Sequence, residues 1–177
     1  MERQKHGFIF EDYIINEYNL TKEIKYTGIY DAYTKDGIPV QIKLEKYNSD
    51  IEMADIFRNS QVNSDFILIV GFWSEDKNNI VEQRIVYFTK ETYLSFFNYE
   101  LLKEFESFLK EMTNDYSDDI KWKSQIALFK KEWQQKTLNF IRPRFKRDHK
   151  KQKRIQCAIN NKDFHDYINQ VGEYTWE

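Results

Sequence analysis

The sequence has one cysteine, no internal repeat and no apolar run of membrane-spanning length, and each absence narrows what the protein can be. A single cysteine, Cys157, excludes an internal disulfide and a cysteine-based zinc cage. No apolar segment approaches the roughly 20 residues of a membrane span, and the N-terminal residues lack the apolar core of a signal peptide. The histidines His6, His149 and His165 show no metal-ligand spacing. We therefore expect a protein inside the cell, in the cytoplasm, with no membrane contact.

What is present indicates one folded unit with an uneven charge. The 177 residues suffice for one well-buried core, and 41% hydrophobic with 17% aromatic residues excludes a disordered chain. The net charge of −2 divides into +7 between residues 142 and 154 and −9 elsewhere. Such asymmetry is typical of a protein that binds a polyanion. The basic residues of this segment are Arg142, Arg144, Lys146, Arg147, Lys150, Lys151, Lys153 and Arg154.

The first half of the chain alternates between helical and strand patterns. Phe8, Ile14, Ile15 and Tyr18 fall at helical spacing and predict a helix over 7–19. A hairpin follows, with arms over 23–34 and 38–46, and then a helix over 51–61 that Ser49 or Asp50 caps and that buries Met53, Ala54 and Phe57. Residues 65–73 read as a central strand buried on both faces, and 81–89 as the next strand. This order implies a mixed sheet with helices packed on it.

The second half begins with two helical patterns. Apolar residues from Leu94 to Met112 step at three and four and predict a helix over 91–113, and Trp122 to Trp133 mark a second that ends before Pro143. We interpret 91–141 as a helical hairpin added to a core of about 3–90. The basic segment, a short strand over 154–159 and a helix over 162–171 complete the chain. No linker divides it, so we expect one α/β domain over 1–177.

Polar residues gather on one face of the predicted hairpin. Asp36-Gly37 between two strand-like runs is a strong hairpin signal. In the second arm Val40, Ile42 and Leu44 alternate with a polar row consisting of Gln41, Lys43 and Glu45. With a three-residue loop, or a bulge near Pro39, Asp31 of the first arm opposes Gln41. We predict that arrangement, although the row also fits the solvated face of an edge hairpin.

Glu11, Asp31 and the Gln41-Ile42-Lys43 element together resemble the PD-(D/E)XK nuclease superfamily, in which a helix glutamate, a strand aspartate and an acid-x-Lys element form the site. Glu11 lies within the apolar stripe of its helix, where a carboxylate is costly unless it is paired or binds a metal. The sequence departs from the family pattern at Tyr30, which replaces a proline, and at Gln41, which replaces an acid. Glutamine at this place occurs in the family, for example in the nicking subunit of a bacterial transposon. Glu45 remains open as an alternative carboxylate.

The resemblance implies a restriction-endonuclease-like fold, a mixed sheet flanked by helices, and Mg²⁺-dependent hydrolysis of DNA. Glu11, Asp31, Gln41 and Lys43 would be catalytic, and Mg²⁺ (or Mn²⁺ in its place) would be held by Glu11, Asp31, the Gln41 side chain and the Ile42 carbonyl. A sequence-specific type II restriction-type enzyme that cuts double-stranded DNA as a homodimer fits best.

Several alternatives stay open. They are a transposase-type or repair nickase or resolvase, a catalytically dead DNA-binding protein on the same fold, and a helical-hairpin interaction module. The basic segment would contact phosphates, unless it is a charged loop that contacts nothing. Base readout would fall to groups around the last strand: Arg154, Gln156, Asn160 and Asn161.

Overall fold

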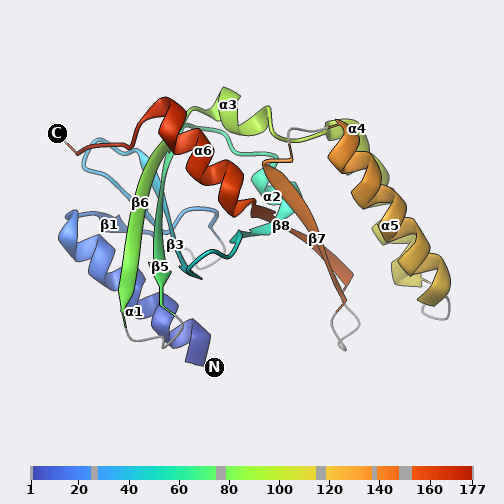
Figure 1. Cartoon of the computed structure of the whole chain (residues 1–177), viewed down its shortest axis with the longest axis horizontal. Helices are drawn as coiled ribbons and strands as arrows, with labels where there is room; N and C mark the ends of the chain where they lie inside the picture. The colour runs from blue at the N-terminus through green and yellow to red at the C-terminus, as the bar shows by residue number, and fades with distance from the viewer. Residues whose placement is uncertain are drawn as a thin grey trace.

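The computed structural model describes residues 2–24, 28–74, 79–114, 119–136, 139–147 and 153–176. Its main sheet has the strand order β1-β2-β3-β5-β6 (Figure 1). β1, β2 and β3 form an antiparallel meander, β5 runs parallel to β3, and β6 is antiparallel to β5. The mixed sheet that the sequence implied is therefore confirmed. Its strands are β1 (Thr21–Lys22), β2 (Ala32–Tyr33), β3 (Pro39–Lys46), β5 (Phe66–Trp73) and β6 (Ile80–Phe88).

Helix α1 (Glu2–Glu17) covers one face of this sheet. Its Phe10 and Ile14 are buried in a cluster with strand residues that alternate onto the same face: Val40, Ile42, Ile67, Ile69 and Ile85. The Phe10 ring lies directly over Gly71, where a Cβ atom would collide with it. Phe8, which the sequence pattern placed in the buried stripe, is 48% exposed, so the stripe is centred on Phe10 instead.

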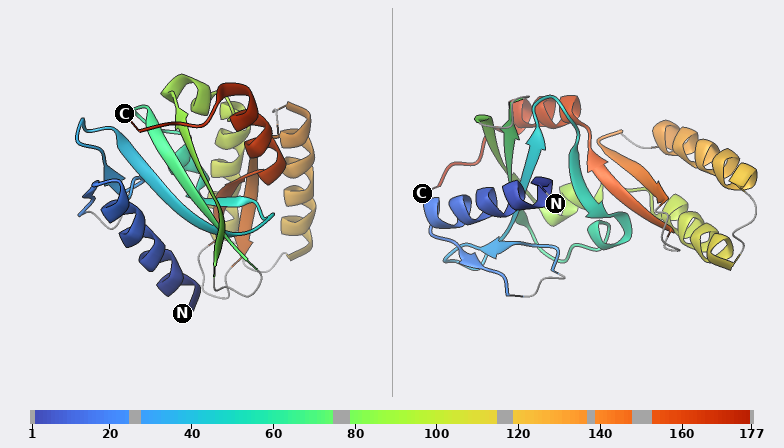
Figure 2. Two further views of the ribbon diagram at one scale, coloured as in Figure 1. Left: turned by 60° about the vertical axis from the view of Figure 1, so that its left-hand side comes forward. Right: turned by 90° about the horizontal axis from the view of Figure 1, so that it is seen from below.

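The opposite face of the main sheet packs against a second, antiparallel sheet of order β4-β8-β7. Leu68, Val70 and Phe72 of β5 enter this second cluster together with residues of β4, β7, β8 and α6. Figure 2 shows α1 on one side of the main sheet and the second sheet on the other. The additional elements are β4 (Ile51–Asp55), α2 (Ile56–Asn59), α3 (Lys90–Leu94), β7 (Ile141–Arg147), β8 (Lys153–Ile159) and α6 (Asn161–Val171).

The expected helix over 51–61 is wrong, because its first half is strand β4 and only Ile56–Asn59 is helical. β8 supplies the partner, pairing Ile51 with Ile159, and a bulge lies between Glu52 and Ala54. Ala54 has a φ of 66° and is exposed rather than buried. The carboxylate of Asp55 caps α2 by accepting the N–H of Arg58, so neither Ser49 nor Asp50 caps this helix.

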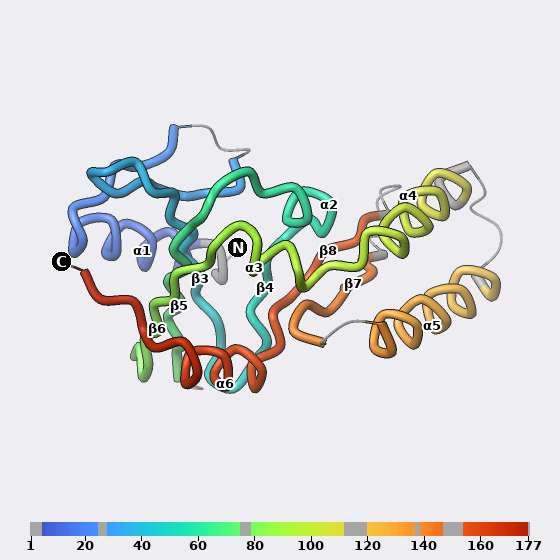
Figure 3. The backbone as a smooth tube through the Cα atoms, turned by 90° about the horizontal axis from the view of Figure 1, so that it is seen from above, coloured from blue at the N-terminus to red at the C-terminus, as the bar shows by residue number. Residues whose placement is uncertain are grey.

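The helix expected over 91–113 is interrupted. α3 ends at Leu94 and α4 (Tyr99–Asn114) begins anew, with Asn98 Oδ1 accepting the N–H of Leu101 at 3.0 Å. α4 and α5 (Asp119–Lys136) form an arm that extends away from the sheets (Figure 3). Trp133 of α5 donates its indole N–H to the Ile141 carbonyl at 2.6 Å, which ties the arm to β7.

The strands expected over 65–73, 81–89 and 154–159 and the helix over 162–171 are confirmed as β5, β6, β8 and α6. None of the helices in the described part of the chain combines the length and the apolar character that a membrane-spanning helix requires.

Candidate functional site

The loop between β2 and β3 has three residues, as the sequence predicts. The N–H of Thr34 donates to the Ile38 carbonyl at 2.9 Å, and the N–H of Gly37 donates to the Thr34 carbonyl at 3.0 Å. Gly37 adopts a φ of 80°, which favours glycine at the end of this loop. Ala32 pairs with Val40, and Asp31 immediately precedes this pair at the start of β2.

Asp31 is fixed against β3 by two hydrogen bonds. Its N–H donates to the Val40 carbonyl at 2.9 Å, and its Oδ2 accepts the N–H of Ile42 at 2.7 Å. The side chain is partly buried, and its bond to the Ile42 N–H places the carboxylate at the Gln41–Ile42 peptide. The proposed strand aspartate and the Gln-x-Lys element are therefore brought together.

Gln41 is the unusual member of this group. Its side chain is only 3% exposed, and its Oε1 is buried without a hydrogen-bond donor among the described residues. A buried acceptor without a donor costs about 1–3 kcal/mol, so proteins seldom retain one that nothing uses. A carbonyl oxygen beside a carboxylate is a suitable ligand pair for a hard cation such as Mg²⁺. The residues present here fit such an ion.

Lys43 and Glu45 continue the row on the same face of β3, because side chains alternate along a strand. This row lies across from β4: Glu45 Oε1 accepts the N–H of Glu52 at 3.0 Å. Glu45 is also four strand residues, about 13 Å, from Gln41. The Glu45 carboxylate is therefore bonded to β4, and Gln41 is the better candidate for completing a site with Asp31.

Glu11 lies elsewhere in the structure. Its carboxylate forms an ion pair with Lys22 at 3.1 Å, and Lys22 also contacts Asp12 at 2.7 Å. These bonds, first to Asp12 and then to Glu11, raise the pKa of Lys22. Within the described residues no contact joins Glu11 to Asp31 or Gln41, and no three acidic, His or Cys side chains converge as a metal site. A role for Glu11 in the site remains a prediction.

The basic segment forms the hairpin of β7 and β8. Arg142, Arg144 and Lys146 alternate onto one face of β7, and the pairing places Gln156 opposite Arg144 and Arg154 opposite Lys146. The side chains of Arg147 and Lys153 lie outside the described structure, as do the residues Lys150 and Lys151. Asn160, considered above for base readout, is 6% exposed and caps α6 by accepting the N–H of Asp163 at 3.0 Å.

Asp50 organises this hairpin, a role that no sequence pattern predicts. Its Oδ2 accepts from Arg144 at 2.5 Å and from Arg142 at 3.4 Å, while its Oδ1 accepts the N–H of Asn161 at 3.0 Å. One carboxylate thus joins the β3–β4 turn, β7 and the start of α6. The partners lie about a hundred positions further along the chain, and no local pattern connects residues so far apart.

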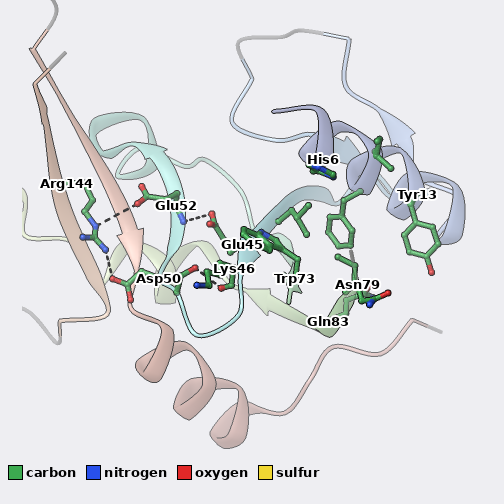
Figure 4. Close-up of a pocket in the computed structure, with 15 residues that line it drawn as sticks. His6, Tyr13, Glu45, Lys46, Asp50, Glu52, Trp73, Asn79, Gln83 and Arg144 are labelled. Atoms are coloured by element: carbon green, nitrogen blue, oxygen red, sulfur yellow. Dashed lines mark hydrogen bonds and ion pairs between the residues drawn. The ribbon is translucent and has the colours of Figure 1, made fainter. Parts of the chain in front are cut away.

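A cleft of about 960 Å³ opens between α1 and β7, at the ends of β3 and β5 (Figure 4). One wall is charged and contains Glu45, Asp50, Glu52 and Arg144, whereas the other, from α1, β5 and β6, carries His6, Tyr13, Trp73 and Gln83. Glu45 belongs both to this cleft and to the polar row of β3, so the cleft continues the candidate site along the strand.

No protein family and no curated protein matches this chain.

Proposed function

We propose that the protein is a Mg²⁺-dependent DNA endonuclease whose site is built from Asp31, Gln41 and Lys43. The observation that carries the proposal is the buried Oε1 of Gln41, which has no donor among the described residues, together with the bond from the N–H of the next residue, Ile42, to the Asp31 carboxylate. The proposal is supported by helix α1 over the β1-β2-β3 meander and the parallel strand β5, since the PD-(D/E)XK pattern uses a helix, a hairpin and a following strand.

Each residue has a separate role in this proposal. The Asp31 carboxylate and the Gln41 carbonyl oxygen would hold Mg²⁺, with the Ile42 carbonyl as a further candidate ligand. When bound, the ion supplies Lewis-acid polarisation of the phosphate and lowers the pKa of a water. Lys43 orients the attacking water and offsets the negative charge that grows on the phosphate oxygens. Glu11 can join the site only if it exchanges its ion pair with Lys22.

The proposed substrate is double-stranded DNA. The basic face of the β7–β8 hairpin, with Arg142, Arg144, Lys146 and Arg154, supplies cations at one edge of the second sheet, where they suit the phosphate backbone. Because two strands must be cut, a homodimer of the restriction type is the simplest assembly.

A second candidate function is DNA binding without catalysis. It is favoured by the Glu11–Lys22 ion pair and by glutamine at the place of an acid, since within the proposed set they leave only the carboxylate of Asp31 at β3. A nickase of the transposase or repair type shares the Gln-x-Lys element and remains an alternative within the enzyme class.

The experiment is cleavage of a mixed plasmid and phage DNA substrate in Mg²⁺ and then in Mn²⁺. Lys43→Gln and Asp31→Asn are compared with wild type, since Asp31→Asn keeps an acceptor for the Ile42 N–H. Lys35→Gln, an exposed lysine in the loop of the same hairpin, is the matched control. We expect Lys43→Gln to lower the cleavage rate about 10²–10³-fold, the usual cost of removing one charge-stabilising group.

The products separate the candidates. Discrete bands that disappear in Lys43→Gln and Asp31→Asn support a sequence-specific nuclease, and nicked circles that disappear in the same variants support a nickase. Intact DNA that nevertheless binds, with no rise in melting temperature on adding either metal, would reject the catalytic proposal in favour of the binding protein.

A further inference from the structure

The cleft between α1 and β7 is distinct from the proposed catalytic residues. Asp31, Gln41 and Lys43 do not line it, and its contact with the polar row of β3 is through Glu45. Glu45 follows Lys43 by two strand residues, about 7 Å along β3. A nucleic acid held at Lys43 would therefore reach this cleft within one or two nucleotides.

The wall formed by α1, β5 and β6 has the chemistry of a nucleobase site. Tyr13, which is 54% exposed, and Trp73, which is partly buried, both line the cleft with aromatic side chains. Gln83 donates its amide N–H to the hydroxyl of Tyr18 at 2.8 Å, which fixes the orientation of the amide at the cleft wall. Aromatic faces stack with any base, and amides hydrogen-bond to base edges.

The opposite wall carries three carboxylates, each with a partner within the protein. Glu45 accepts the N–H of Glu52, Asp50 accepts from Arg144, and Glu52 lies 4.0 Å from the Nε of Arg144. Arg144 therefore remains positioned at the cleft by two acids and has further N–H groups for a phosphate or a base. Repulsion of a nucleotide by this wall is reduced because the acids are engaged.

We propose that this cleft binds an unpaired nucleotide of the DNA substrate, with the base stacked against the Tyr13 and Trp73 wall and the backbone toward Arg144. The volume of about 960 Å³ lies at the upper end of the range for ligand sites, and it admits one or two nucleotides. Bases within an intact duplex are stacked on each other and cannot present their faces to aromatic side chains. This inference rests on the proposed function, and it assigns the protein a preference for DNA with a single-stranded segment or an extruded base.

Two variants on the same helix test the proposal. A short fluorescein-labelled single strand and the corresponding duplex are titrated in EDTA, so that binding is measured without cleavage. Tyr13→Ala should bind the single strand about tenfold more weakly, the typical loss of one base–aromatic stack, and should bind the duplex as wild type does. Phe8→Ala, which removes an exposed aromatic from α1 outside the cleft, should bind both DNAs normally.

Tryptophan fluorescence gives a second readout that does not depend on affinity. Trp122 and Trp133 are buried in the arm and Trp176 stacks on Tyr18 with ring centroids 4.7 Å apart, whereas Trp73 lines the cleft. Single-stranded DNA should therefore quench the emission of wild type and leave that of Trp73→Phe unchanged.

The outcomes separate this inference from the proposed nuclease. Equal single-strand affinity in Tyr13→Ala and Phe8→Ala, or quenching that persists in Trp73→Phe, would overturn the nucleotide site. If Lys43-dependent cleavage remained, the nuclease proposal would survive that result. Conversely, Tyr13-dependent binding without any metal-dependent cleavage would overturn the nuclease and leave the cleft as a nucleotide site.

Discussion

The polar row of β3 and the basic hairpin treat their polar groups in opposite ways. Among the described residues the Oε1 of Gln41, which is 3% exposed, has no donor, whereas Arg142 and Arg144, each 40% exposed, bind Asp50 although their Nε atoms have no hydrogen-bond acceptor. The first region gives up stability and retains an acceptor that is available to a cation or a water. In the second region Asp50 holds the two arginines in place, and a DNA phosphate that bound them would compete with this carboxylate. This difference is the one we expect between the proposed cation site and a surface proposed to position a polyanion.

The largest effect should come from removing the carboxylate of the basic hairpin. We expect Asp50→Leu to lower the free energy of unfolding by about 3 kcal/mol, since it leaves two guanidinium groups and the Asn161 N–H without their acceptor. Urea denaturation measures this change. Asp50→Asn keeps an acceptor for Asn161 and should lose clearly less. Equal stability of Asp50→Leu and wild type would show that the carboxylate does not hold these elements together.

At Gln41 we expect a substitution to raise the free energy of unfolding instead of lowering it. Gln41→Leu removes a buried acceptor without a donor, so in EDTA it should raise the free energy of unfolding by about 1 kcal/mol. The same variant should lose any stabilisation by Mg²⁺. Gln41→Glu should instead be less stable in EDTA and gain more from Mg²⁺, because it adds a buried charge that the ion neutralises. A structural glutamine, bonded through a water, would make Gln41→Leu less stable than wild type.

A smaller effect is expected on the salt dependence of DNA binding. If Lys146 contacts a phosphate, Lys146→Ala should reduce the slope of log K against log salt by about 0.9. Lys162→Ala, which removes an exposed lysine on α6 that pairs with Asp166, is the control and should leave the slope unchanged. Identical slopes for Lys146→Ala and wild type would remove this face of the hairpin from the DNA interface.

The smallest effect is expected at Asp65, whose carboxylate, like that of Asp50, accepts hydrogen bonds from other groups of the protein. The backbone N–H of Lys90, and after it the hydroxyl of Tyr87, hold the pKa of Asp65 below its ordinary value. A carboxylate whose pKa is lowered by folding stabilises the protein at pH values above its unfolded pKa of about 4. This stabilisation is lost as the pH falls through the pKa of the folded state. Melting temperatures of wild type and Asp65→Asn should therefore differ at pH 7 and converge toward pH 3. A constant difference across this range would contradict the assignment.

Local patterns predicted the elements whose partners are close in sequence. The β2–β3 hairpin follows from Asp36-Gly37 and from strand alternation, although Ala32–Tyr33 is the only strand among the described residues of the arm expected over 23–34. β5 follows from a continuous apolar run. The expected helix over 51–61 failed because its apolar spacing suits a helix as well as a strand, and β8 decides between them from the far end of the chain. The centring of α1 on Phe10 rather than Phe8 depends likewise on space above Gly71, which no helical pattern reveals.

The candidate site was predictable where it depends on register and not where it depends on ion pairs. The three-residue loop that brings Asp31 against β3 could be worked out from the period of a strand. The ion pair of Glu11 with Lys22 requires β1 to lie beside α1, and the pairing of Arg144 with Asp50 requires the two sheets to meet. Charges on separate elements find their partners only through the tertiary structure.

The bond between Asp50 and Asn161 spans 111 positions, and the paired strands β4 and β8 are separated by a similar length of sequence. During synthesis, β3 and β5 leave the ribosome long before β7 and β8 of the second sheet, which covers the face opposite α1. Leu68 and Val70 therefore remain open to solvent until residues 141–161 have emerged, and contacts at such separation form slowly. The nascent chain thus passes through a long interval in which an uncovered apolar sheet face and the unpaired edge of β4 are available to chaperones.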